Sequence, residues 1–186
     1  MKLQSARKAI HDATSLDVHG VSGDWQKYGC HIQKSSIGSV DRMIVDRIEA
    51  GYILKAVYDQ LPHVRDWLLY AYSFDADKNH KAFLAAHLFQ RLFQSERFSG
   101  HARLRRLADV AVDDFKARQV NHRSLPIAYI CNRISEGESR KIFESNYKRD
   151  GWDKLMLKTQ DLLDTFDRIG LSAVAVVINK LNGCQK

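Results

Sequence analysis

Apolar residues recur at spacings of three and four along almost the whole chain, and strict alternation of apolar and polar residues is rare. A spacing of three and four places side chains on one face of an α-helix, whereas a half-buried strand needs a period of two. Only two prolines, Pro62 and Pro126, interrupt the 186 residues, and each fits the first turn of a helix. The sequence therefore predicts an all-α fold, a compact multi-helix domain.

Capping residues and glycines set the expected helix boundaries. Ser39 and Asp77 are good N-caps, and Gly100 and Gly170 are expected to end helices. The expected helices cover residues 3–13, 39–59, 62–73, 78–99, 104–115, 155–169 and 172–181, in addition to a hairpin between 124 and 152. The segment at 172–181 is rich in β-branched residues, but its short length and the absence of a partner strand favour a buried helix.

The apolar faces of these helices predict the core. The side chains expected to turn inward are Val40, Ile44, Ile48, Tyr52, Leu54, Val57, Phe83, Leu84, Leu88, Leu92, Phe93, Leu104, Leu107, Ala108, Ala111, Val112 and Phe115. The segment RDWLLYAY, residues 65–72, has aromatic residues all around a helix, which predicts a central, buried position. Residues 14–38 contain four glycines and predict an irregular arm. We divide the chain into an N-terminal helical body at 1–122 and a C-terminal subdomain at 123–186.

The chain is basic, because 29 Lys and Arg residues stand against 22 Asp and Glu residues, a formal net charge of +7. Such a surface attracts polyanions through counterion release, which points to a nucleic-acid partner. No apolar run is long enough to span a membrane, and the first residues lack the apolar segment of a secretory signal. We expect a cytoplasmic protein with no membrane partner.

The stretch SLPIAYICNRISEGESRKIFESNYKRDGW, residues 124–152, predicts a short apolar helix, a turn and a second helix with a cationic face. That is the layout of a helix-turn-helix, in which one helix braces the unit and the next enters a DNA groove. The residues expected to face the core are Ile127, Ala128, Ile130, Ile134, Ile142, Phe143 and Tyr147.

The outer face of the second helix would then be available to double-stranded DNA. The candidate DNA-binding residues are Ser139, Arg140, Lys141, Ser145, Asn146, Lys148 and Arg149. Three glutamates, Glu136, Glu138 and Glu144, dilute the positive field. An ordinary helical hairpin with a solvated face is the alternative interpretation.

Two further features are candidates for binding a partner. A group of basic residues surrounds Gly100 and comprises Arg91, Arg97, His101, Arg103, Arg105 and Arg106. These side chains either form a ridge that contacts phosphates or an acidic protein surface, or pair with Asp109, Asp113 and Asp114 at helical spacing. Trp25 and Tyr28, in the arm, either anchor a partner or seal the arm onto the core.

Motifs for catalysis and metal binding are missing. Cys30, Cys131 and Cys184 lie far apart and form no CxxC pair, so the sequence predicts neither a disulfide framework nor a zinc site. His80 and His87 lie seven residues apart with no carboxylate at metal-ligand spacing. No P-loop, GxSxG, HExxH or GxGxxG motif occurs. We expect no catalytic residue, no metal, no cofactor and no enzymatic activity.

Four segments resemble the late-gene antitermination proteins of the Q type found in phages and prophages. They are WQKYG, RDWLLYAYSFD, RLRRLADVAVDDFKAR and SLPIAYICNRI…SRKIFESNYKRDGWDKL, and the resemblance runs from about residue 25 to 178. It implies a protein of the bacterial host cytoplasm that binds a DNA element at a late promoter. It also implies loading onto paused RNA polymerase with sigma factor still bound, after which the polymerase ignores terminators. Some members carry a zinc site of paired cysteines, and this chain has no such pairs.

Two other classes of function stay open. One is a protein-only interaction module, such as a phage inhibitor of a host enzyme, which would use Trp25, Tyr28 and the arginines after Gly100. The other is a helical enzyme that acts on nucleic acid, which would need clustered carboxylates and a metal ion.

Overall fold

The computed structural model describes residues 5–18, 37–95, 101–135 and 140–184. Within these ranges the chain forms eight helices and no strand, so the predicted all-α fold is confirmed. The helices are α1 Ala6–Val18, α2 Ile37–Tyr58, α3 Pro62–Tyr72, α4 Lys78–Ser95, α5 His101–Asn121, α6 Ile127–Ser135, α7 Arg140–Asn146 and α8 Trp152–Cys184. None of the described helices is long and apolar enough to cross a membrane.

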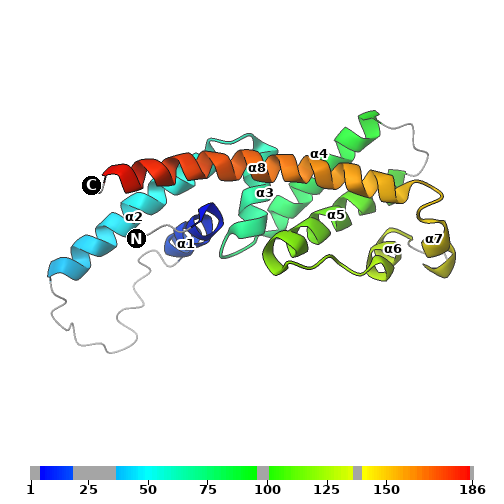
Figure 1. The fold of residues 1–186 in the computed structure, drawn as a ribbon, viewed down its shortest axis with the longest axis horizontal. Helices are drawn as coiled ribbons and strands as arrows, with labels where there is room; N and C mark the ends of the chain where they lie inside the picture. The colour runs from blue at the N-terminus through cyan, green and yellow to red at the C-terminus, as the bar shows by residue number, and fades with distance from the viewer. Residues whose placement is uncertain (1–4, 19–36, 96–100, 136–139, 185–186) are drawn as a thin grey trace, which may run out of the picture.

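The last helix, α8, is the longest, with 33 residues and therefore a length of about 50 Å. It runs along the whole molecule, with α2 beside its C-terminal half and α7 next to its first turn (Figure 1). Leu155 and Met156 belong to one buried apolar cluster, whereas Leu163, Val174 and Ile178 belong to another. A single helix thus joins two cores, and the division near residue 122 stays a prediction.

The larger core centres on α3, as the aromatic segment predicts. Pro62 is the first residue of the helix, where its missing N–H costs nothing. Trp67 and Leu68 are fully buried, and the Trp67 ring packs at 5.1 Å from the Phe115 ring of α5. Helices α1, α2, α4, α5 and α8 all contribute side chains to this core.

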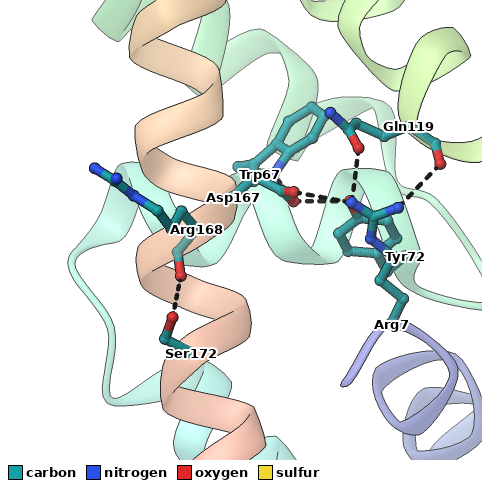
Figure 2. A network of polar contacts seen from close by, with 7 residues as sticks. All are labelled: Arg7, Trp67, Tyr72, Gln119, Asp167, Arg168 and Ser172. Carbon is teal, nitrogen blue, oxygen red and sulfur yellow. Dashed lines mark hydrogen bonds and ion pairs between the residues drawn. The ribbon is translucent and has the colours of Figure 1, made fainter. Parts of the chain in front are cut away.

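A buried carboxylate of α8 ties three helices together (Figure 2). Asp167 accepts a hydrogen bond from the Trp67 indole N–H at 2.9 Å and from the Tyr72 hydroxyl at 2.7 Å. Arg7 of α1 reaches the second carboxylate oxygen at 3.2 Å and also donates to Gln119 of α5. Burial, followed by the charge of Asp167, raises the pKa of Tyr72. The hydroxyl therefore stays protonated and continues to donate.

The predicted inward faces of α2 and α4 are partly wrong. Ile44, Ile48 and Tyr52 are about half exposed, whereas Ala50, Ile53 and Val57 are buried. Helix α2 is apolar on two opposite faces, and only contact with α1, α3 and α8 selects the one that is buried. Likewise, Phe83 and Phe93 of α4 are exposed, while Leu84, Leu88 and Leu92 are buried as expected.

Several predicted boundaries also differ. Ser39 is the third residue of α2 and not its N-cap, and the first helix covers 6–18 in place of 3–13, so the start of the expected arm is helical. Asp77 caps α4 as predicted, because its carboxylate accepts the backbone N–H of Asn79 at 2.9 Å. The rest of the arm, at 19–36, lies outside the described residues.

The predicted helix end at Gly170 is wrong, because α8 continues through this residue. A Cβ atom at position 170 would lie 2.6 Å from Cδ1 of Leu68, which is itself fully buried. The glycine therefore permits the close approach of α3 to α8 and does not terminate the helix.

We expect Gly170→Ala to destabilise the protein by about 1–2 kcal/mol, because overpacking outweighs the gain in helix propensity. Urea denaturation followed by circular dichroism measures this change. Gly51→Ala is the matched control, since nothing lies within 4 Å of a Cβ there, and it should stabilise the protein. In a Leu68→Ala background, Gly170→Ala should cost nothing. A Gly170→Ala variant as stable as Gly51→Ala would contradict the packing argument.

Candidate nucleic-acid interface

Helices α6 and α7 lie at one end of the molecule, next to the first turns of α8 (Figure 1). Their buried residues form the second apolar cluster with α5, to which α6 contributes Ile130, Cys131 and Ile134. Phe143 of α7 packs at 5.7 Å from the Trp152 ring of α8 and at 6.2 Å from the Tyr147 ring. These aromatic contacts hold a helix of only seven residues, which would not be stable alone.

A tight turn connects α7 to α8. The backbone N–H of Trp152 donates to the backbone carbonyl of Tyr147 at 3.1 Å. The backbone N–H of Asp150 donates to the backbone carbonyl of Asn146 at 2.8 Å. Gly151 has a φ of 77°, a left-handed conformation that glycine adopts without strain. Burial raises the pKa of the Tyr147 hydroxyl, so this residue stays neutral. The turn fixes the direction in which the α7 side chains point.

The outer face of α7 and the turn that follows it carry the described candidate DNA-binding residues. Lys141, Ser145, Lys148 and Arg149 are exposed, and Asn146 is half-buried. The Nε atom of Arg149 lies 3.2 Å from the carboxylate of its neighbour Asp150, so its charge is partly compensated. Ser139 and the side chain of Arg140 lie outside the described residues.

The predicted core contacts of this hairpin are partly wrong. Ile127 and Ile142 are about half exposed, whereas Ile130, Ile134, Phe143 and Tyr147 are buried as expected. The core contact of Trp152 was not predicted; this residue is 4% exposed and packs against Phe143. The sequence offers one signal for this contact, the aromatic residues at positions 143, 147 and 152.

The arginines at the start of α5 lie against this cluster and against α4. Arg103 lies over the Phe143 ring at 5.7 Å, and Arg105 lies 6.0 Å from the Phe89 ring. The Nε–H of Arg106 donates to the carbonyl of Ile134, the penultimate residue of α6, at 3.1 Å. A cation at a helix C-terminus is favourable, so Arg106 helps to position α6. Arg97 and the side chains of Trp25 and Tyr28 lie outside the described residues.

The acidic residues of α5 bind cations from other helices. Lys81 of α4 contacts Asp109 at 2.9 Å and Asp113 at 2.8 Å, and Arg133 of α6 reaches Asp109 at 3.0 Å. These two carboxylates therefore link α5 to α4 and α6. Arg103 and Arg105 contact aromatic rings of α7 and α4.

Asp114 of α5 contacts the residue just before α6 and a side chain of α8. This carboxylate is 2% exposed. It accepts the backbone N–H of Leu125, just before α6, at 2.6 Å, and the side-chain amide of Gln160 on α8 at 2.8 Å. Arg118 lies 3.3 Å away and supplies the opposite charge. The buried carboxylate of Asp114 therefore holds the start of α6 against α5.

The two histidines considered as metal ligands have other contacts. His80 lies 2.9 Å from the carboxylate of Asp66, and His87 stacks on His63 with ring centroids 4.4 Å apart and Phe166 beside them. No cluster of three or more metal-ligating residues occurs among the described residues. Burial lowers the pKa of both His63 and His87, and the positive charge of Arg91 lowers it further at each. At His63, the negative charge of Asp66 partly opposes this decrease.

The stacked pair predicts a loss of stability in mild acid. A histidine whose pKa is lower in the folded state binds fewer protons than the unfolded chain, so stability falls as pH drops below about 6.5. We expect His87→Phe to flatten the dependence of the urea midpoint on pH between about 7.5 and 5.5, because it removes a titrating ring and keeps the contact with His63. An exposed, uncharged control on the same helix, Gln90→Ala, should leave the slope unchanged. An equal slope in His87→Phe and the parent would contradict this assignment.

Comparison with known proteins gives one result. The chain matches the family described as phage antitermination protein Q over residues 4–181, which is nearly its whole length. No curated protein and no solved structure gives a significant match. The chain therefore belongs to the phage antitermination protein Q family, and its general role is transcription antitermination, as the resemblance of its four segments implies.

Proposed function

We propose that this phage antitermination protein recognises promoter-proximal duplex DNA through the outer face of α7 and the turn into α8. It then loads onto bacterial RNA polymerase with sigma factor bound. The observation that supports the proposal is the exposure of Lys141 on a short helix, and of Lys148 and Arg149 in the turn after it, while the opposite face of that helix packs into an aromatic core. This function consists of binding and includes no chemical step.

The roles of the α7 side chains follow from their chemistry. Lysine and serine hold phosphate oxygens, whereas Arg149 and Asn146 have the donors and acceptors that read base edges. Asn146 is half-buried and Arg149 contacts Asp150, so base readout rests on few groups. We therefore expect phosphate contacts to provide most of the affinity. Ser139 and Arg140 complete the proposed surface, as the sequence predicts.

Salt titration tests the DNA contact. If about five phosphates are contacted, the logarithm of the binding constant plotted against the logarithm of the salt concentration should have a slope near −4 to −5. Changing Lys141 or Lys148 to Ala should weaken binding to a promoter-proximal duplex and reduce the slope by about 1, as measured by fluorescence anisotropy. The control is Lys180→Ala, an exposed lysine near the other end of α8. Parent-like binding by both variants would show that α7 and the turn after it do not carry the DNA contact.

Run-off transcription tests the polymerase step separately. With the protein's own promoter region and a downstream terminator on the template, added protein should increase readthrough. Unchanged readthrough would count against antitermination at this promoter even if duplex binding persisted. Trp25, Tyr28, Arg103, Arg105 and Arg106 are the residues that we assign to the polymerase contact.

A protein-only interaction module is the second candidate, and one observation favours it. Ile44, Val45, Ile48 and Tyr52 form an exposed apolar face on α2, opposite the face that packs on the core. Exposed apolar surface of this kind is typical of protein contacts. This module would show no duplex affinity above the non-specific level, so the anisotropy experiment distinguishes the two candidates.

A further inference from the structure

A pocket of about 740 Å³ lies between α1, the loop from α3 to α4 and the C-terminal end of α5. Its walls include Arg7, Lys8 and His11 of α1, Phe74 of the loop, and Lys116 and His122 at the end of α5. This volume falls within the range of about 300–1,000 Å³ in which proteins bind small organic ligands.

The pocket carries more positive than negative charge. Arg7, Lys8 and Lys116 line it, of which Arg7 is already paired with Asp167, and Asp12 is the one carboxylate among the described lining residues. Arg7 and Lys8 stand in the first turn of α1, which has no acidic residue. Cations are unfavourable at a helix N-terminus because the helix dipole is positive there. An anion in the pocket would relieve this repulsion.

Among the described residues, Lys116 is held in place by Tyr70 and not by a carboxylate. Its Nζ donates to the carbonyl of Tyr70 at 2.6 Å and lies 4.0 Å from the centre of the Tyr70 ring. Burial lowers the pKa of Lys116, and Asp113 opposes this effect only at longer range. A half-buried ammonium group of this kind gains from an anionic ligand, since a further acceptor would replace lost hydration.

The loop supplies an aromatic wall. Phe74 is 48% exposed, and its ring packs edge-on at 5.6 Å from His11. Its backbone N–H donates to the Thr14 hydroxyl at 2.9 Å, which fixes the loop against α1. An accessible aromatic ring stacks well on a nucleobase. Cations and an aromatic ring therefore face the same cavity.

We propose that this pocket binds a nucleoside phosphate, with Lys8 and Lys116 at the phosphate and Phe74 against the base. The site goes beyond the proposed DNA contact, because it lies at the C-terminal end of α5, whereas α7 packs near the other end of that helix (Figure 1). A free nucleotide and the 5′-phosphorylated end of a nucleic acid strand present the same chemistry. A bare phosphate is too small to use the aromatic wall.

Isothermal titration calorimetry of the full chain in phosphate-free buffer tests the site. AMP and GMP should bind measurably, and adenosine or inorganic phosphate alone should bind at least about tenfold more weakly. Lys8→Gln and Lys116→Met should each weaken AMP binding about tenfold, the effect of losing one charge-assisted contact. A 5′-phosphorylated tetranucleotide that competes with AMP would identify a strand end as a second source of the ligand.

Lys78→Gln is the matched control, since Lys78 is exposed in the first turn of α4 and does not line the pocket. It should bind AMP as the parent does. Lys8 is exposed, so Lys8→Gln keeps the test valid if Lys116→Met fails to fold. No binding of AMP or GMP at millimolar concentration would overturn the proposal. So would parent-like AMP affinity in Lys8→Gln, equal affinity for AMP and inorganic phosphate, or a tetranucleotide without a 5′-phosphate that competes with AMP as well as the phosphorylated one does.

Discussion

Replacing Asp167 by Ala is expected to cost about 3–5 kcal/mol of unfolding free energy, a large part of the total for a protein of this size. The change leaves the buried indole N–H of Trp67 and the hydroxyl of Tyr72 without their acceptor. Arg7 also loses its ion pair, but its side chain is 39% exposed, so water screens that part of the loss. Urea denaturation followed by circular dichroism measures the effect.

Two variants separate the network from the helix that carries it. Asp167→Asn keeps an oxygen acceptor in place and should cost less than Asp167→Ala. Asp164→Ala removes an exposed carboxylate from the same helix and should change stability by less than about 0.5 kcal/mol. If Asp167→Ala were no less stable than Asp164→Ala, the buried carboxylate would not hold α1, α3 and α8 together.

Replacing Asp114 by Ala is expected to cost about 2–4 kcal/mol and to loosen α6 and α7 more than the rest of the fold. The backbone N–H of Leu125 and the amide of Gln160 lose their acceptor, and Arg118 loses its counter-charge. Hydrogen exchange should therefore accelerate in residues 127–146 beyond the global change. Because α7 is held through this region, affinity for duplex DNA should fall as well.

Asp161→Ala is the matched control for this experiment, since Asp161 is exposed on α8 beside Gln160. It should leave both exchange and DNA affinity unchanged. Uniform acceleration of exchange across the chain in Asp114→Ala would mean that this residue supports the whole fold and does not specifically position the hairpin.

Two of the predicted helix starts agree with the structure. Pro62 at the first position of α3 and Asp77 as the cap of α4 are confirmed, because capping depends on neighbours in sequence. The central burial of Trp67 is also confirmed, since a helix that is apolar on all sides has no other stable position.

The candidate site is only partly predictable. Phe143 and Tyr147 are buried as expected, whereas Ile142 and Ile127 are about half exposed, and Trp152 and α5 side chains complete the cluster instead. The pairing of Asp109 and Asp113 with Lys81 of α4 has no local signal, since those residues lie about thirty positions apart. The pocket beside α1 likewise joins segments distant in sequence.

The sequence by itself determined the helical class, the starts of α3 and α4, the excess of positive charge and the family, because each depends on composition, local spacing or similarity along the chain. Only the tertiary structure decided which face of α2 is buried and whether α8 ends at Gly170. Helix α2 is apolar on both sides, so its neighbours choose the face. Gly170 looks like a helix end until Leu68 of α3 is found where its Cβ atom would be.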